Sequence, residues 1–525
     1  MADYYISSAG NDSNDGSIGS PWLTLSKAQS TVSANDTIYL NKGDSWRELF
    51  TVPQNGITID AYGSGDAPVI SGAVDQSSGW TTTGIGSWWY IVSSDLGVVL
   101  EDGAPLTFIE WDTDFATTTA GATAGSYTYW VGANILYVWV SDGTDPGTHT
   151  IDVATRNYCI DVDTKDNVTI QNINVEMAAL HNIRAENADS LTIDTVTTQK
   201  CGSKYVTSVY IGNGVEIGNG CTNFTVSNIT YDHIFDSGVS AQTYTTNGVS
   251  ISGGAFTNIT GKRAGYSGIE VAVTGSITDS YIENITITNP QISATGYGFS
   301  GQRYGNKANG IHLETPSATG SSYLKGITIT GGRVYNNVGN GIFGLENLGL
   351  VSITKTVVYG NLLDSVVIGG ITDPNTLGLD LKQCIVYNTV GHGVFYANSD
   401  GQRAQIDDNV IVSNGNTANT KYNILFTDIN TAVTNTFRRN ICAGSLSYAL
   451  AVQFTNANMV MDQNKYIELG TAKIASFNSV EYDTADVASY RTATGREAQT
   501  TFGSAVRARL CVSRAARSTR PAKAA

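Results

Sequence analysis

Proline, charged residues and paired cysteines are scarce in this sequence, and each scarcity excludes a class of protein. Only 9 of the 525 residues are proline and 14% are charged, whereas glycine reaches 56. This composition is typical of a turn-rich β protein and not of a disordered chain. No CxxC or CxxH spacing occurs, which argues against a zinc site. The scattered cysteines allow a Cys201–Cys221 bridge or buried free thiols; they are Cys159, Cys201, Cys221, Cys384, Cys442 and Cys511.

Long apolar runs are also missing. No run is long enough to cross a membrane, so we expect no membrane partner. The first residues, MADYY, lack the basic region and apolar core that are typical of a signal peptide. We expect a protein that is extracellular or associated with a virion.

Positive charge is scarce outside the C-terminus. The net charge is −16, and six basic residues without any acidic one fall in the last 25 residues. The remainder has 24 basic and 46 acidic residues, a net charge of −22, so we expect it to repel nucleic acid. The basic segment, residues 505–525, is predicted to be disordered. It could be an arm that binds nucleic acid or an artefact of the reading frame.

A repeated phrase is abundant instead. Residues 214–217, 238–241, 268–271 and 310–313 read GVEI, GVSA, GIEV and GIHL, with a variable residue between two apolar ones. Val, Ile and Thr alternate at period two, and helical spacing is nearly absent. One fixed phrase per 24 to 31 residues indicates a solenoid. The sequence therefore predicts an all-β, right-handed parallel β-helix whose interior contains Ile183, Val215, Ile269 and Ile311.

Over most of its length the chain resembles the pectate-lyase-like superfamily of parallel β-helix proteins. The opening SAGNDSNDG followed by SPW is similar to that of many secreted β-helix repeat proteins. The resemblance implies a polysaccharide partner. It leaves the reaction open, because the superfamily includes lyases, hydrolases, epimerases, phage tailspikes and adhesins.

The repeat also suggests how the chain is divided. Six of the eight tryptophans lie in a segment without the repeat, which predicts a small antiparallel β domain inserted into the helix. Asp12, Asn14 and Asp15 could ligate calcium or satisfy their own turn. We expect an N-terminal cap and first coils at 1–72, the insertion at 73–152, the main β-helix at 153–460, a C-terminal cap at 461–504 and the basic tail at 505–525.

A column of variable residues marks the candidate site. Equivalent residues of successive coils stack about 4.8 Å apart and point out of the coil, and this column is polar in the middle coils and apolar afterwards. We expect the functional site where the polar members of this column lie beside the long loops that enter the same strands, because loops on a rigid scaffold often carry function. The catalytic candidates are Glu270, His312, Glu216, Asp236 and Glu314, and the substrate-binding candidates are Lys262, Arg263, Tyr266, Arg303, Tyr304, Lys307, Gln242, Trp88 and Trp89.

Two chemistries fit these residues. In hydrolysis one carboxylic acid protonates the leaving oxygen and a second carboxylate activates water or attacks the sugar. In β-elimination a Lys or Arg base acts next to a uronate carboxylate, with calcium as a possible cofactor. Hydrolysis of an anionic polysaccharide, with no required cofactor, is slightly favoured. A non-catalytic carbohydrate-binding adhesin or tailspike-like module is the further alternative, and the oligomeric state stays open.

Overall fold

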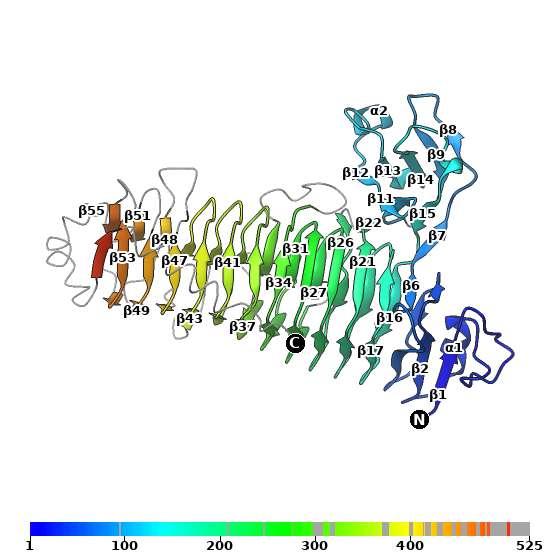
Figure 1. The fold of residues 1–525 in the computed structure, drawn as a ribbon, viewed down its shortest axis with the longest axis horizontal. Helices are drawn as coiled ribbons and strands as arrows, with labels where there is room; N and C mark the ends of the chain where they lie inside the picture. Colours follow the sequence, from blue (N-terminus) through cyan, green and yellow to red (C-terminus); the bar gives the residue numbers. More distant parts are fainter. Residues whose placement is uncertain are drawn as a thin grey trace. The chain divides into compact units, whose positions relative to one another are not determined.

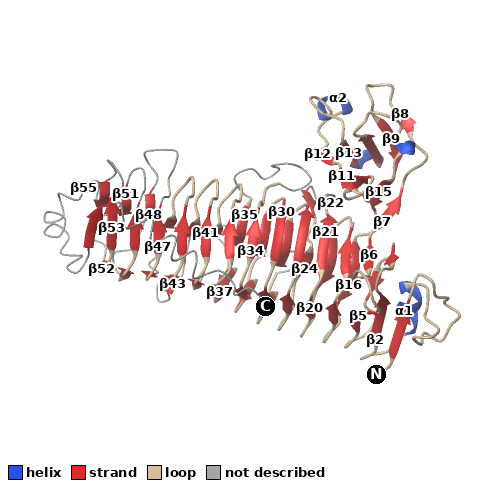
Figure 2. Cartoon of the chain, in the orientation of Figure 1, coloured by secondary structure: helices blue, strands red, loops and turns tan. Residues whose placement is uncertain are grey.

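The computed structural model describes most of the chain, and its regular secondary structure is almost entirely β-strand (Figures 1 and 2). The described residues are 1–93, 96–206, 209–244, 247–275, 277–297, 308–315, 321–369, 377–397, 403–412, 414, 422–427, 434–443, 448–452, 459–468, 473–477, 480–482 and 501–504. They divide into two compact units. The first contains residues 1–242, 251–270 and 295–297, and the second contains 243–250, 271–294 and the described residues from 308 onward.

Three parallel sheets build the first unit, and each coil contributes one strand to each sheet. The first sheet contains β1 (Asp3–Ile6), β2 (Thr37–Asn41), β5 (Thr58–Tyr62), β17 (Thr169–Gln171), β20 (Thr192–Asp194), β25 (Thr225–Ser227) and β29 (Ala255–Thr257). The second contains β4 (Phe50–Thr51), β16 (Tyr158–Asp163), β19 (His181–Ala185), β24 (Val215–Ile217), β27 (Ser237–Thr243) and β31 (Ser267–Val273). The third contains β3 (Ser45–Trp46), β6 (Val69–Ser71), β18 (Asn174–Glu176), β21 (Thr197–Cys201), β26 (Thr230–Ile234) and β30 (Thr260–Ala264).

The second unit has the same three-sheet plan. Its first sheet contains β33 (Thr286–Thr288), β37 (Ile327–Thr330), β40 (Val351–Thr354), β43 (Leu377–Lys382), β46 (Arg403–Asp407), β49 (Asn435–Arg438) and β52 (Met459–Asp462). Its second contains β35 (Asn309–Glu314), β39 (Ile342–Leu345), β42 (Val366–Gly369), β45 (Val394–Ala397), β48 (Tyr422–Thr427), β51 (Tyr448–Val452), β54 (Lys473–Phe477) and β55 (Val480–Tyr482). Its third contains β34 (Gln291–Ser293), β38 (Arg333–Tyr335), β41 (Val357–Tyr359), β44 (Ile385–Tyr387), β47 (Val410–Val412), β50 (Ile441–Ala443), β53 (Lys465–Glu468) and β56 (Thr501–Ser504).

The predicted fold class and interior are confirmed. Ile183 pairs with Val215, and Val215 pairs with Val239, in parallel register. The side chains of Ile183, Val215, Ile269 and Ile311 are fully buried. Because alternate residues of a strand point to opposite faces, the residues between these apolar ones face away from the interior.

Asparagine forms many of the corners. Asn228 and Asn258 have φ angles of 52° and 54°, in the left-handed region that asparagine adopts more readily than most residues. In the second unit Asn409, Asn440 and Asn464 form a buried ladder, with Nδ2 donating to the next Oδ1 at 3.0 and 3.1 Å. These bonds satisfy amides that would otherwise be costly to bury.

The insertion consists of two small sheets, antiparallel except where β12 pairs with β13. One contains β7 (Ala73–Asp75), β10 (Val99–Glu101), β11 (Ala104–Pro105) and β15 (Ile151–Ala154), and the other contains β8 (Thr81–Thr82), β9 (Trp89–Val92), β12 (Thr107–Ile109), β13 (Ser126–Trp130) and β14 (Ile135–Trp139). The insertion packs on the coils of the first unit: the Phe108 ring lies 4.9 Å from Tyr210 and 5.7 Å from Phe235. Phe235 directly precedes two residues of the candidate site, Asp236 and Ser237.

Helices are short. The N-terminal helix is α1 (Leu25–Thr31), whose first turn is capped by the Thr24 side chain, and α2 (Phe115–Thr118) lies in the insertion. No helix in the described part of the chain has the length and apolar character that a membrane span requires.

Parallel pairing continues past residue 460, where the sequence suggested a cap. The strand β53 pairs in parallel with β50 and with β56, so the third sheet extends to Ser504. The sequence did not predict these strands, because their pattern of apolar residues differs from the repeated phrase of the earlier coils. The basic tail at 505–525 lies outside the described residues.

The Cys201–Cys221 bridge is excluded. Both side chains are buried free thiols, and the Cys201 Sγ donates to the Asn213 carbonyl at 3.2 Å. Cys201 is the last residue of β21, whereas Cys221 follows β24, so the alternation that buries them does not bring them together.

Candidate active site

The second sheet of the first unit carries the predicted polar column. Asp161 lies opposite Arg184, Arg184 opposite Glu216, and Glu216 opposite Ser240. Glu270 lies on β31, the next strand of that sheet after β27. The repeat phrase therefore gave the correct register for this column.

The side chains of the column point away from the interior of the coils, but several of them are nevertheless buried. Glu216 is 1% exposed, Glu270 is 4% exposed and Ser240 is fully buried. Polar neighbours close over the two carboxylates, namely Asn213 and Ser240 at Glu216, and Ser237 and Gln242 at Glu270. Period-two alternation predicts which way a side chain points but not which neighbours cover it.

Glu216 is a carboxyl whose environment disfavours its charge. The Asn213 Nδ2 donates to its Oε2 at 2.6 Å, and the Ser240 hydroxyl donates to the same oxygen. Burial, with smaller contributions from the negative charges of Asp236 and Glu186, raises the pKa of Glu216 to about 7, although the two hydrogen bonds oppose the shift. Glu216 therefore keeps a proton in a large fraction of molecules at neutral pH.

Glu270 accepts two hydrogen bonds on one oxygen. The Ser237 hydroxyl donates to its Oε2 at 2.5 Å and the Gln242 Nε2 donates at 2.8 Å. The Ser237 hydroxyl also lies 2.9 Å from that of Ser267. Because Gln242 is half-buried, it lies on the more open side of this group, and its binding role stays a prediction.

Asn213 connects the two carboxylates. Besides donating to Glu216, it accepts the backbone N–H of Ser237 on its Oδ1 at 2.8 Å, and Ser237 donates to Glu270. Its own backbone N–H donates to the His181 Nδ1 at 3.0 Å. Burial, with the nearby Arg184 charge, lowers the pKa of His181 to about 3, so His181 is neutral. Asn213 and His181 were not predicted, because neither lies in the column.

Arg184, the basic member of the column, is engaged by carboxylates on both sides. One guanidinium nitrogen lies 3.1 Å from the Asp161 Oδ1 and another contacts Glu186. The guanidinium also lies 5.2 Å from the centre of the Tyr158 ring. Arg184 therefore balances the acidic end of the column.

The second unit contains the His312 part of the predicted site. The His312 Nδ1 lies 2.8 Å from the Asn309 Nδ2, and its Nε2 lies 2.9 Å from the Glu314 Oε2. An amide nitrogen can only donate, so Nδ1 accepts and Nε2 carries the proton toward Glu314. Glu270 belongs to the first unit and His312 to the second, so their expected pairing stays a prediction.

The column turns apolar beyond His312, as predicted. Phe343, Val367, Phe395 and Leu425 follow His312 in register. A pocket of about 350 Å³ opens over this stretch, and the sequence gave no signal for it. Its lining is apolar except for two polar side chains and one glycine; it consists of Asn340, Phe343, Leu345, Leu362, Leu363, Asp364, Val367, Val390, Gly391 and Phe395.

The two predicted basic residues that the structure describes do not lie on the strands of the column. Lys262 and Arg263 lie on β30 of the third sheet, not in a loop. The Arg263 guanidinium binds Asp232, and the Lys262 Nζ lies 4.0 Å from the same carboxylate. Tyr266 lies closer to the catalytic candidates, since its backbone N–H donates to the backbone carbonyl of Asp236 at 2.9 Å. Arg303, Tyr304 and Lys307 lie outside the described residues.

The predicted tryptophan platform is corrected in part. Trp88 is 3% exposed and packs against Phe115 and Trp139, so it belongs to the core of the insertion. Trp89 is half-buried on β9. A different pair is accessible: Trp130 is 39% exposed and its ring stacks on Trp111 at 5.2 Å and 3°. Alternation alone did not identify the outer face of β13.

The acidic side chains of the N-terminal turn accept hydrogen bonds from nearby backbone and hydroxyl groups. The Asp12 Oδ1 accepts the N–H groups of Leu23 and Thr24, and its Oδ2 accepts the Thr24 hydroxyl. The Asp15 carboxylate accepts the Ser17 N–H at 3.0 Å. These bonds satisfy the two carboxylates, and the calcium alternative stays untested.

Comparison with known proteins yields distant structural likenesses. No family model and no curated protein matches the chain. A solved complex of XylC with xylose has a TM-score of 0.46 and 13% identity, covering 90% of this chain and 76% of that one. A glycoside hydrolase (TM-score 0.41, 9% identity, 96% and 97% covered) and a rhamnogalacturonan lyase (0.42, 12%, 84% and 87%) are also similar. At these values the likenesses assign no activity to this chain.

Proposed function

We propose that this protein cleaves glycosidic bonds of a polysaccharide through the carboxylates of the first unit. The observation that carries the proposal is the difference between two acids of one column: burial raises the pKa of Glu216 to about 7 and its two donors are buried, whereas one of the two donors at Glu270 is the half-buried Gln242. Two carboxyl groups in unequal environments are what acid–base cleavage of a glycoside requires.

The spacing of the two acids supports the same reaction. Glu216 and Glu270 lie on β24 and β31, with β27 between them, which corresponds to roughly 9.6 Å at about 4.8 Å per strand. This value lies at the upper limit of the carboxyl separation, about 6.5–9.5 Å, that leaves room for a water and is typical of inverting enzymes. We therefore infer inversion of the anomeric configuration, with Glu216 as the acid and Glu270 as the base.

Asp236 supplies the accessible negative charge of this group. It is half-buried at the start of β27, and its charge contributes to the raised pKa of Glu216. The half-buried Asp236 and Gln242 are the positions through which a sugar would approach the covered acids. Substrate binding would thus have to displace part of this cover.

The proposal favours hydrolysis over elimination. An eliminating enzyme needs a basic group at the reacting carbon, and Asp232 engages both Lys262 and Arg263 on another sheet. An anionic substrate remains part of the proposal through Arg303 and Lys307. Its binding would weaken with salt, because exposed charges are screened within about 8 Å at physiological ionic strength.

A specific observation favours a second candidate, a carbohydrate-binding module without catalysis. Glu216 and Glu270 are almost fully covered, and serine, asparagine and glutamine satisfy them, as in a structural polar ladder. In that case the exposed Trp130 and the half-buried Trp111 stacked on it would hold the sugar, since aromatic faces stack on apolar sugar faces.

Incubation with a panel of neutral and anionic polysaccharides distinguishes these candidates. Hydrolysis predicts shorter chains with new reducing ends and no ultraviolet signal. Elimination leaves an unsaturated, ultraviolet-absorbing end. Bound but uncut polysaccharide would contradict cleavage and support the binding module.

A further inference from the structure

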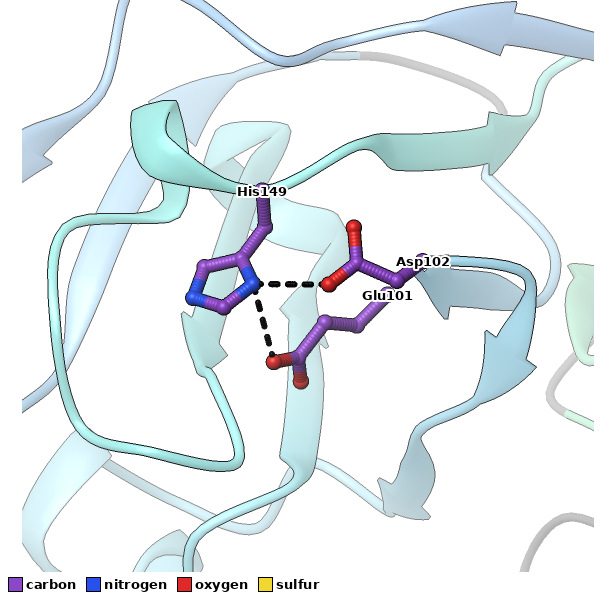
Figure 3. Close-up of side chains that lie close together, drawn as sticks. All are labelled: Glu101, Asp102 and His149. Carbon is purple, nitrogen blue, oxygen red and sulfur yellow. Dashed lines mark hydrogen bonds and ion pairs between the residues drawn. The ribbon is translucent and has the colours of Figure 1, made fainter.

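A second cluster of titratable side chains lies in the insertion, where the proposed reaction uses no residue. Glu101 ends β10, Asp102 follows it in the turn to β11, and His149 precedes β15 (Figure 3). The His149 Nδ1 lies 2.9 Å from the Asp102 Oδ2 and 3.4 Å from the Glu101 Oε1. One ligand atom from each of the three residues lies within 4.8 Å of the other two.

Backbone and hydroxyl groups orient both carboxylates. The Thr150 N–H donates to the Asp102 Oδ1 at 2.9 Å. The other carboxylate oxygen, Oδ2, faces the His149 imidazole. The Ser141 N–H and hydroxyl hold the Glu101 carboxylate at 2.8 and 2.7 Å. Glu101 is only 5% exposed. Its charge is thus fixed in a covered position beside the imidazole.

The second nitrogen of His149 faces another carboxylate. The Nε2 lies 3.3 Å from the Asp142 Oδ1 and 3.1 Å from the Thr144 hydroxyl. A histidine that binds a metal through one nitrogen almost always donates its other N–H to a carboxylate, a carbonyl or water. His149 has this arrangement, with Nδ1 toward two oxygens and Nε2 toward the orienting group.

The sequence of the insertion gives an independent reason to expect a cation. Residues 73–152 contain no lysine or arginine, and His149 is their one basic residue. Ten acidic residues share this segment; they are Asp75, Asp95, Glu101, Asp102, Glu110, Asp112, Asp114, Asp142, Asp145 and Asp152. Such an unbalanced negative field attracts cations from solution.

We propose that Glu101, Asp102 and His149 bind a divalent transition metal such as Zn²⁺, with Asp142 orienting the imidazole. The nitrogen ligand favours a transition metal over calcium or magnesium, which prefer oxygen ligands. The metal takes the place of the proton between Nδ1 and the two carboxylates, and this proton leaves to solvent. The bound ion would tie the β10–β11 turn to the start of β15.

Calorimetric titration of the metal-free full-length protein with Zn²⁺ tests the site. The wild type should bind one ion saturably, and Zn²⁺ should raise its melting temperature. Asp102→Asn keeps the bond from Thr150 but removes a ligand charge, so saturable binding and the melting shift should disappear. Asp142→Asn should weaken binding about 10- to 100-fold, as expected for an outer partner.

Glu110→Gln is the matched control, because it removes the same charge from an exposed position of the insertion, and its affinity should equal that of the wild type. The Asp102 side chain is 58% exposed, so its replacement leaves the core intact, and circular dichroism verifies the fold. A wild type without saturable binding, or an Asp102→Asn variant that binds as tightly as Glu110→Gln, would overturn the site. Neither result depends on polysaccharide cleavage.

Discussion

The Ser240 hydroxyl donates to the Glu216 carboxyl directly opposite it on the neighbouring strand. A partly protonated, buried acid therefore has a fixed partner, and Asn213 extends this contact toward Ser237 and Glu270. The catalytic proposal depends on this chain of polar groups, because it holds two acids in different environments within one sheet.

The first prediction concerns the effect of pH on stability through Glu216. Its pKa is about 7 in the folded protein against 4.5 ordinarily. Between these values the folded state holds a proton that the unfolded state has lost, so this group's contribution to the free energy of unfolding falls as pH rises from about 4.5 to 7. Glu216→Gln removes the effect. The variant's stability relative to wild type should rise by up to a few kcal/mol, on the order of 1.4 per pKa unit, across that window in urea melts.

The second prediction concerns His181, whose effect has the opposite sign. Its pKa is about 3 when folded against 6.5 ordinarily. The unfolded state therefore takes up a proton that the folded state refuses, and stability is lost as pH falls from about 6.5 toward 3. His181→Asn keeps an acceptor near the Asn213 N–H and cannot titrate. Its urea-unfolding stability should decline less on acidification than that of wild type, and an equal decline would contradict the neutral buried imidazole.

The third prediction tests the register of the coils. Ile269 is fully buried, so Ile269→Asp places an unpaired charge in the interior and should cost several kcal/mol or abolish folding. Thr225→Asp is the control, because Thr225 is exposed on β25, and it should change stability by about 0.5 kcal/mol or less. Thermal melts that do not separate the two variants would show that the register is wrong.

The fourth prediction separates the two tryptophan positions. Trp88→Ala should destabilise the insertion by about 3–5 kcal/mol, as other large-to-small core changes do, because Trp88 packs among aromatic rings. Trp130→Ala should leave the fold intact and weaken polysaccharide binding in affinity electrophoresis. Unchanged retention of Trp130→Ala would remove the stacked pair from the binding surface.

The sequence predicted the sheet register well and the environment of the site poorly. The phrase GVEI placed Glu216 between two inward residues because alternation is a local property of a strand. The cover over Glu216 comes from Asn213 and Ser240, which belong to a preceding turn and a different coil. No periodicity in one strand contains that information.

Pairing between distant residues explains the other corrections. Lys262 and Arg263 looked free in the sequence, but Asp232 lies opposite Lys262 on the adjacent strand. Trp88 looked like an exposed aromatic, but the helix α2 brings Phe115 against it. In each case a partner about 30 residues away decides whether the side chain is available to a ligand.

The rate of polysaccharide cleavage by Glu270→Gln tests the central claim most directly. The substitution keeps the shape of the side chain and removes its acid–base function, so turnover should fall about 10²- to 10⁴-fold. Binding and the melting temperature should stay near those of wild type, and Glu110→Gln should keep full activity. Wild-type turnover by Glu270→Gln, or an ultraviolet-absorbing product that survives this substitution, would contradict the account.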